Sequence, residues 1–330
     1  MSPLAFVLTL SCYRRWPSRF STPYSHNLLV LFSSTATTIT PPNGKESPSS
    51  GPAPPPIRVA LTESTGRAVF ATRRIGAGDT IHTAKPIVSH PSLSAITTVC
   101  YFCLKKINAV TASQSQGVSF CSENCKESSK KADWLAFDDY CRTQGLKYPL
   151  LVKRLACMVI SGAAPAGILD ILQPANLTQG MILKMEEGFH LLRNALVKAN
   201  IGDEHMSFLA KQWYTDVLAR IRINAFRIEL AAGVYEDLLS LASASIEAEA
   251  AVGNAIYMLP SFYNHDCDPN THIVWIENAD AKLKALRDID EGEELRICYI
   301  DASMSCDARE SLLSQGFGFK CNCLRCMSGD

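Results

Sequence analysis

Two groups of closely spaced cysteines carry the clearest chemistry in the sequence. The first group is a Cys-x-x-Cys pair followed by a Cys-x-x-x-Cys pair. Cysteines separated by one to three residues are poorly placed to form disulfides with each other, whereas their thiolates suit the tetrahedral coordination of zinc. We therefore expect one complete structural zinc site from Cys100, Cys103, Cys121 and Cys125.

The second group lies near the end of the sequence. Cys321, Cys323 and Cys326 offer three thiolates, and a closed structural zinc site requires four ligands. Cys267 is the best candidate for the fourth, because it lies in the polar run Asn264–Asn270. A zinc ion at this site would tie the last residues to the centre of the chain. The alternative is an exposed, redox-active tail.

Composition excludes some classes of protein. The chain has 330 residues, 47% of them hydrophobic, which allows one large domain or two ordinary ones. Lys and Arg together number 32, as do Asp and Glu; residues 1–56 hold four of the basic and one of the acidic side chains, so 28 basic and 31 acidic ones follow. A nucleic-acid-binding protein is expected to be basic, so we expect no direct nucleic-acid binding. The apolar runs are too short for a membrane span.

The first 56 residues resemble a targeting segment and a linker in composition. Residues 1–45 lack Asp and Glu, contain three arginines and are rich in Ser and Thr, which is typical of a mitochondrial or plastid transit peptide. A secretory signal and a disordered tail are the alternatives. Residues 41–56 include seven prolines, which indicates a linker. We assign residues 1–40 to a transit peptide or disordered segment and begin the folded part at Ile57.

A repeated pattern marks the strands that must position the cysteines and the polar run. Residues 71–81 and 285–295 share the sequence Ala-x-Arg-x-Ile-x-x-Gly-acid-x-aliphatic. Each copy predicts the end of a strand, a turn whose glycine takes a positive φ, and the start of a second strand. We therefore expect two hairpins in one mixed sheet system.

Helices are expected between the two copies of the pattern. Apolar residues in 126–220 recur at helical spacing, and residues 234–250 are rich in Ala, Leu and Glu, which predicts a shorter helix. We expect these apolar stripes to form core and not a ligand pocket.

Together these motifs resemble a known family. The polar run 264–270, the sequence Leu-Arg-Ile-Cys-Tyr at 295–299, the Cys-x-Cys-x-x-Cys ending and the sequence Gly-Arg-Ala-Val-Phe-Ala at 66–71 resemble the SET and post-SET region of protein-lysine methyltransferases. The inserted cysteine group makes the chain similar to the SET-and-MYND branch and to the plant trithorax-related SET proteins. The resemblance covers about residues 57–330.

The resemblance implies an α+β class of fold: a β-rich SET fold with a knot-like cofactor pocket, interrupted by a zinc finger and a helical insert. The expected parts are the N-terminal part of SET at 57–99, a MYND-like finger at 100–141, a helical insert at 142–221, the C-terminal part of SET at 222–305, and a post-SET zinc tail at 306–330.

The resemblance also implies methyl transfer from S-adenosylmethionine to the ε-amine of a lysine in a protein substrate. Tyr299 is expected at the catalytic position, where a phenol orients the attacking amine and stabilises charge around the methyl group. The residues expected to bind the cofactor by similarity are Gly66, Arg67, Ala68, Asn224, Asn264, His265 and Phe319.

The finger departs from the two-zinc MYND pattern. No cysteine lies between Cys103 and Cys121, and Phe137 stands where a histidine would precede Cys141. We therefore expect a reduced finger with one zinc ion, and two zinc ions in the whole chain.

Three further departures keep other functions open. Ala68 replaces a glycine of the first motif, Asp266 replaces a serine, and Phe317 stands where a tyrosine is frequent. A catalytically weak SET scaffold that acts as a peptide-binding adaptor is therefore an alternative, and a thiol redox protein would require metal-free cysteines. Family analogy suggests histone substrates in the nucleus, whereas the N-terminal composition suggests a non-histone substrate in an organelle.

Overall fold

The computed structural model describes residues 54–107, 113–115, 117–127, 135–231 and 251–330. These residues belong to one compact unit, Pro54–Asp330. The expected transit peptide, most of the linker and the helix predicted in 234–250 lie outside the described residues. Within the described part of the chain, no helix is long and apolar enough to cross a membrane.

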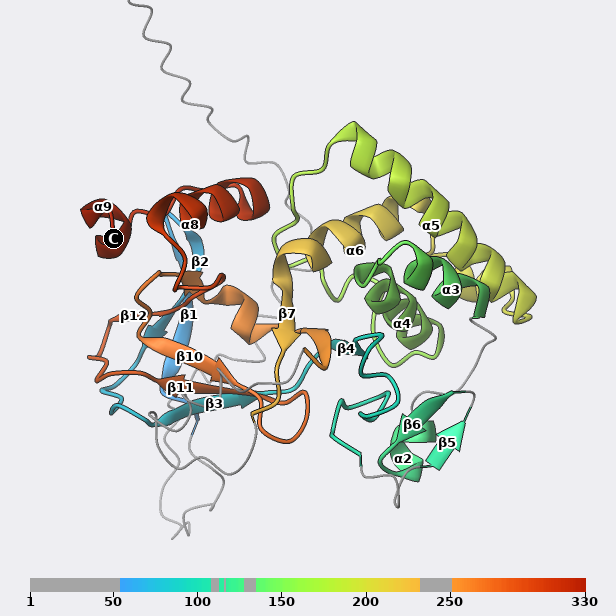
Figure 1. Ribbon diagram of the computed structural model, residues 1–330, viewed down its shortest axis with the longest axis horizontal. Coiled ribbons are helices and arrows are strands. Elements are labelled where there is room, and N and C mark those ends of the chain that lie inside the picture. The colour runs from blue at the N-terminus through green and yellow to red at the C-terminus, as the bar shows by residue number, and fades with distance from the viewer. Residues whose placement is uncertain (1–53, 108–112, 116, 128–134, 232–250) are drawn as a thin grey trace, which may run out of the picture. The chain divides into compact units, whose positions relative to one another are not determined.

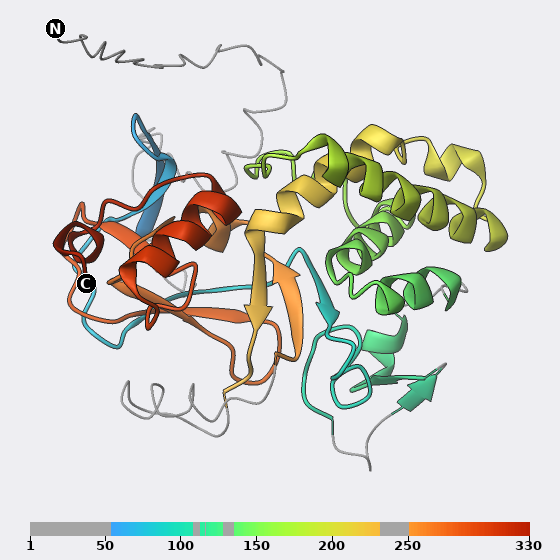
Figure 2. The same ribbon diagram turned by 45° about the horizontal axis from the view of Figure 1, so that its top comes forward.

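The described residues form four sheets, of which the three larger ones lie beside a group of helices (Figures 1 and 2). The first sheet joins four strands in the order β1-β2-β12-β9, and only its β12–β9 pair is parallel. Its strands are β1 (Ile57–Thr62), β2 (Gly66–Ala71), β12 (Glu294–Ile297) and β9 (Asn264–His265).

Two further sheets are antiparallel and have three strands each, and the fourth is the two-stranded antiparallel sheet of the finger. One has the order β10 (Thr271–Val274), β11 (Ala281–Ala285), β3 (Thr80–Ala84). The other has the order β4 (Val88–Pro91), β8 (Gly253–Ile256), β7 (Ala225–Ile228). The described parts are therefore of the α+β class, as expected.

The repeated pattern forms strands and turns, but the expected hairpins are wrong. β2 pairs with β12 and β3 pairs with β11, so each strand finds its partner in the other copy of the pattern. Gly78 and Gly292, at equivalent positions, both have φ of +83°, which confirms the expected turns.

Buried backbone between the strands explains this pairing. Ile75 and Ile289, the central residues of the two copies, are almost fully buried and exchange backbone hydrogen bonds of 3.0 and 2.9 Å. The Ala71 N–H donates to Glu293 O and the Ala285 N–H donates to Asp79 O, again at equivalent positions. A buried connection must pair its own N–H and C=O groups. Here the backbone N–H and C=O groups of each copy form hydrogen bonds with those of the other copy.

Four helices fill the segment for which apolar spacing predicted helices: α3 (Leu135–Thr143), α4 (Tyr148–Ile160), α5 (Gln179–Lys198) and α6 (Lys211–Asn224). Pro149 lies in the first turn of α4, where a missing N–H costs nothing, and the Thr178 hydroxyl caps α5 by accepting from the Met181 N–H. Their buried faces include Leu151, Leu192 and Tyr214, all within the main core.

The remaining elements carry the cysteine groups. The finger contains β5 (Ser113–Ser115), β6 (Val118–Phe120) and α2 (Glu123–Glu127). The C-terminal tail contains α8 (Cys306–Leu312), a π-helical turn η3 (Leu313–Phe317) and α9 (Leu324–Ser328). Short 3-10 turns occur at η1 (Asp203–Met206) and η2 (Leu259–Phe262).

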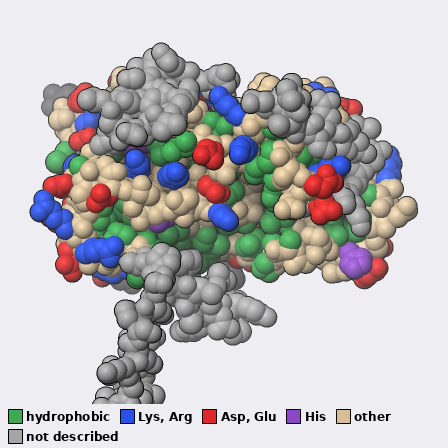
Figure 3. Space-filling model, turned by 90° about the horizontal axis from the view of Figure 1, so that it is seen from below, with side chains coloured by type: hydrophobic (Ala, Val, Ile, Leu, Met, Phe, Trp, Pro, Cys, Tyr) green, Lys and Arg blue, Asp and Glu red, His purple; other side chains and the backbone are tan. Residues whose placement is uncertain are grey.

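On the face drawn in Figure 3, charged side chains of both signs are interspersed between apolar ones.

Candidate active site and metal centres

The parallel pair β9–β12 brings the polar run and the expected catalytic tyrosine together. Arg296 lies opposite Asn264 and Ile297 lies opposite His265 in this pair. Tyr299 follows β12 by two residues, and its ring centroid lies 5.3 Å from that of His265. Residues more than 30 positions apart in the sequence thus form one site.

Tyr299 is held by two hydrogen bonds. Its hydroxyl donates to the main-chain oxygen of Tyr263 at 2.6 Å, and its backbone N–H donates to Nδ1 of His265 at 3.1 Å. Burial raises the pKa of the Tyr299 phenol well above its ordinary value. The phenol is therefore neutral, and its oxygen can accept a hydrogen bond but cannot act as an ionised base.

Aromatic side chains surround this phenol. The rings of Phe317 and Phe319 lie 5.1 and 6.4 Å from that of Tyr299 between centroids. The Phe319 ring also lies 6.0 Å from that of His265. Phe317 stands where a tyrosine is frequent in the family, so the aromatic ring is present and the tyrosine hydroxyl is not. This aromatic wall suits a flat purine and a sulfonium cation, the two recognisable groups of S-adenosylmethionine.

Asn264 links the polar run to the turn between β1 and β2, to β2 and to β12. Its Nδ2 lies 3.0 Å from Thr65 Oγ1, 3.3 Å from the main-chain oxygen of Arg67 and 2.7 Å from Glu294 Oε1. The predicted residues of β2 and β9 therefore meet. Gly66, the first residue of β2, has φ of +73° and open space where a side chain would stand, which fits close approach of a ligand to its backbone.

A loop around residues 171–176 links the remaining predicted cofactor residues. The Arg67 guanidinium donates to the main-chain oxygen of Ile171, and Asn224 Nδ2 donates to that of Gln173 at 2.8 Å. Asn176 lies beside Gly318, the residue before Phe319. The structure thus brings Arg67, Asn224 and Gly318, the neighbour of Phe319, to one loop.

Ala68 differs from the other predicted cofactor residues. It is fully buried on β2 opposite Ala60, so it has no exposed surface in this structure. Its methyl group therefore does not narrow an open pocket. Asp266, the other departure near the site, lies 3.3 Å from the guanidinium of Arg296, which compensates its charge.

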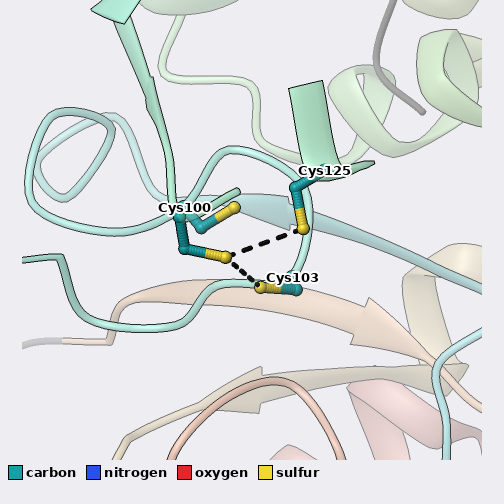
Figure 4. A group of neighbouring side chains, drawn as sticks. Cys100, Cys103 and Cys125 are labelled. Carbon is teal, nitrogen blue, oxygen red and sulfur yellow. Dashed lines mark hydrogen bonds between the residues drawn. The ribbon is translucent and has the colours of Figure 1, made fainter. Parts of the chain in front are cut away.

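The finger cysteines point toward one another, as Figure 4 shows for Cys100, Cys103 and Cys125. The four sulfur atoms of Cys100, Cys103, Cys121 and Cys125 all lie within 4.8 Å of one another. The Cys103–Cys121 and Cys121–Cys125 distances are 3.6 and 3.7 Å. Zn–S bonds of about 2.3 Å in a tetrahedron place sulfur atoms about 3.8 Å apart. The set therefore fits one zinc ion, with its thiolates converging from a loop and from α2.

The C-terminal set fits zinc equally well. The sulfur atoms of Cys267, Cys321, Cys323 and Cys326 also lie within 4.8 Å of one another, with Cys267 3.5 Å from Cys326 and 4.0 Å from Cys321. This set forms a small separate core with Leu313, against which Tyr299, Phe317 and Phe319 pack. The chain can thus hold two zinc ions, one of them directly behind the aromatic wall.

Two site residues were missed by sequence reasoning. Tyr263 is fully buried, accepts the bond from Tyr299 through its main chain, and contacts His82 Nε2 through its hydroxyl at 3.0 Å. Its position directly before the polar run was the available signal. Arg309 is fully buried in α8, and its Nη2 lies 3.8 Å from Cys326 Sγ. Nothing in its sequence context indicated this placement.

A family model and known proteins match most of this chain. Residues 66–300 match the SET domain family model. Histone-lysine N-methyltransferase ATXR4 of Arabidopsis thaliana is 66% identical over 285 residues, which cover 84% of this chain and 88% of that protein. A SET and MYND domain-containing protein of Dictyostelium discoideum is 23% identical over 74% of this chain and 76% of its own length.

A solved structure titled as the SET domain of LSMT bound to lysine and AdoHcy also matches. Its TM-score is 0.35 at 11% identity, over 82% of this chain and 54% of that chain, a likeness too low to bear on function. The family match and the similarity to ATXR4 show that this chain belongs to the SET-domain family of protein-lysine methyltransferases.

Proposed function

We propose that this protein transfers a methyl group from S-adenosylmethionine to the ε-amine of a lysine in a protein substrate. The observation that carries the proposal is the constellation at β9–β12: Asn264 and His265 lie beside Tyr299, whose phenol is fixed in an aromatic wall. The name of the 66% identical relative, a histone-lysine N-methyltransferase, supports the same activity.

The chain's own residues position the reaction and exclude water from it. The bound cofactor supplies an electrophilic methyl group on a sulfonium, which needs in-line approach more than strong acid or base. Tyr299 is neutral and anchored at both its hydroxyl and its N–H, so it can orient an amine without taking its proton. An apolar, aromatic channel lowers the pKa of an entering lysine and favours the reactive neutral amine.

The substrate is a histone or a non-histone protein of an organelle. The name of the similar relative favours a histone in the nucleus, and the composition of residues 1–45 favours a mitochondrial or plastid location. We also propose that the protein does not bind nucleic acid directly. The interspersed charges in Figure 3 and the formal net charge of zero support this.

The test is methyl transfer from labelled S-adenosylmethionine by the full chain, with histones and organellar proteins offered separately. Tyr299→Phe is compared with Tyr140→Phe, which removes a partly exposed hydroxyl on α3 that contacts Glu187. Label on one protein pool, lost in Tyr299→Phe and kept in Tyr140→Phe, would support the proposal and identify the substrate class. Cofactor binding with no label on either pool would instead favour a non-catalytic adaptor.

A further inference from the structure

We propose that His265 is a positioning residue that couples zinc at the C-terminal site to the placement of Tyr299. Its two ring nitrogens contact one group each: Nδ1 lies 3.1 Å from the backbone nitrogen of Tyr299, and Nε2 lies 3.2 Å from Cys267 Sγ. The ring therefore forms a bridge from a metal ligand to the expected catalytic residue.

The backbone of Tyr299 fixes the protonation of this ring. A peptide N–H can only donate, so Nδ1 must be the unprotonated, accepting nitrogen. The neutral ring then carries its hydrogen on Nε2 and points it at Cys267 Sγ. His265 as a whole residue is 9% exposed, so little of the ring is open to water. Both polar atoms of the side chain thus serve protein groups, and any cofactor contact by His265 falls to its backbone or its ring face.

Charge at the cysteine set makes the bridge depend on the metal. Four thiolates and one Zn²⁺ carry a net charge of −2, and hydrogen bonds from N–H groups to ionised acceptors are stronger than those to neutral ones. His265 supplies such a donor to Cys267, and the buried Arg309 lies against Cys326. Without zinc, nothing holds the four sulfur atoms at a common centre, so Cys267 Sγ is no longer fixed opposite Nε2. The ring then loses the partner that fixes its orientation.

The consequence reaches Tyr299 because this residue has few other anchors. Its N–H depends on His265, its O–H depends on the Tyr263 carbonyl, and its ring packs beside Phe317 on the C-terminal cysteine core. Loosening the His265 ring therefore removes the polar anchor of the Tyr299 backbone and leaves only the hydroxyl bond to Tyr263. The effect on turnover rests on the proposed methyl transfer, whereas the hydrogen bond to the zinc ligand does not.

The first test is spectroscopic and needs no turnover. The full chain is loaded with ¹¹³Cd in place of zinc, which should give two resonances, one for each cysteine set. His265→Phe should move one resonance and leave the other in place, so the finger serves as an internal reference. His190→Phe, on an exposed histidine of α5, should move neither. Two unmoved resonances in His265→Phe would overturn the proposal.

The second test uses the unmutated protein, so its result does not depend on whether the His265→Phe variant folds. Nitrogen-15 spectra of labelled histidine should show His265 as the Nε2–H form, with a proton protected from exchange that becomes exposed when the metal is chelated. An Nδ1–H ring or an imidazolium would overturn the proposal. In turnover, His265→Phe should lower kcat about 10-fold or more with a smaller change in KM for protein substrate, and His265→Gln should restore part of it. An inactive wild-type chain with the expected spectra would refute methyl transfer alone.

Discussion

The hydroxyl of Tyr299 donates to the main-chain oxygen of Tyr263, 2.6 Å away and one residue before the Asn264–His265 pair. This bond ties the expected catalytic phenol to the start of the segment expected to bind the cofactor. It also leaves the phenol oxygen with lone pairs for an incoming amine. The position of the phenol is thus set by the same short segment that organises the pocket.

Removing this hydroxyl should damage turnover more than binding. Tyr299→Phe keeps the ring between Phe317 and His265 but loses the polar anchor, so we expect kcat to fall by about 100-fold with little change in cofactor affinity. Steady-state kinetics and calorimetric titration with S-adenosylmethionine check this. A variant with full kcat would remove Tyr299 from the catalytic position.

The two cysteine sets should hold one zinc ion each, and only one should matter for the cofactor. Cys321→Ser should lower zinc from two ions per chain to one and weaken cofactor binding, because Phe317 and Phe319 pack on that set. Cys121→Ser should also lose one ion but keep cofactor binding.

Metal analysis by mass spectrometry, beside calorimetric titration, measures both effects. Cys157→Ser is the matched control, because Cys157 lies on α4 outside both sets and its loss should leave two ions per chain. Two ions retained in Cys321→Ser would contradict the assignment of this site.

Alanine at Gly78 and alanine at Gly292, which occupy equivalent turns, should destabilise the fold to the same extent. Gly78 and Gly292 share φ of +83° with open space around them, so alanine at either position brings backbone strain without a clash. We expect each variant to lower the free energy of unfolding by about 1–2 kcal/mol. Urea denaturation measures this. Gly180→Ala, at a helical position of α5 with equal open space, should show no loss. Unequal costs at the two turns would argue against their structural equivalence.

Acid should destabilise the fold partly through His82. Burial lowers the pKa of this imidazole from 6.5 to about 4, so it stays neutral in the folded protein while the unfolded chain binds a proton below pH 6.5. The part of the unfolding free energy that this lowered pKa provides is fully present above pH 6.5 and is lost as the pH falls toward 4.

His82→Gln removes this titration, so its unfolding free energy should fall by about 1 kcal/mol less than that of the wild type between pH 7.5 and 5.5. Urea denaturation at the two pH values gives the difference directly. Parallel losses in both proteins would show that His82 does not carry this pH dependence.

The sequence by itself determined the chemistry and its local geometry. Thiolates two to four positions apart along the chain can reach one ion wherever the chain goes, which is why seven of the eight zinc ligands could be named from spacing. Cys267, the eighth, was proposed from its place in the polar run. Gly78 and Gly292 likewise predicted their turns, because a positive φ is a property of one residue.

Tertiary structure alone decided the partners. The repeated pattern could not show that its strands pair between copies, because the hydrogen bonds of Ile75 are supplied by Ile289 more than 200 positions away. The bridge through His265 was hidden for the same reason: which nitrogen accepts depends on where the Tyr299 N–H and the Cys267 sulfur lie in space. Local propensity acts within a few residues, whereas burial obliges distant polar groups to satisfy one another.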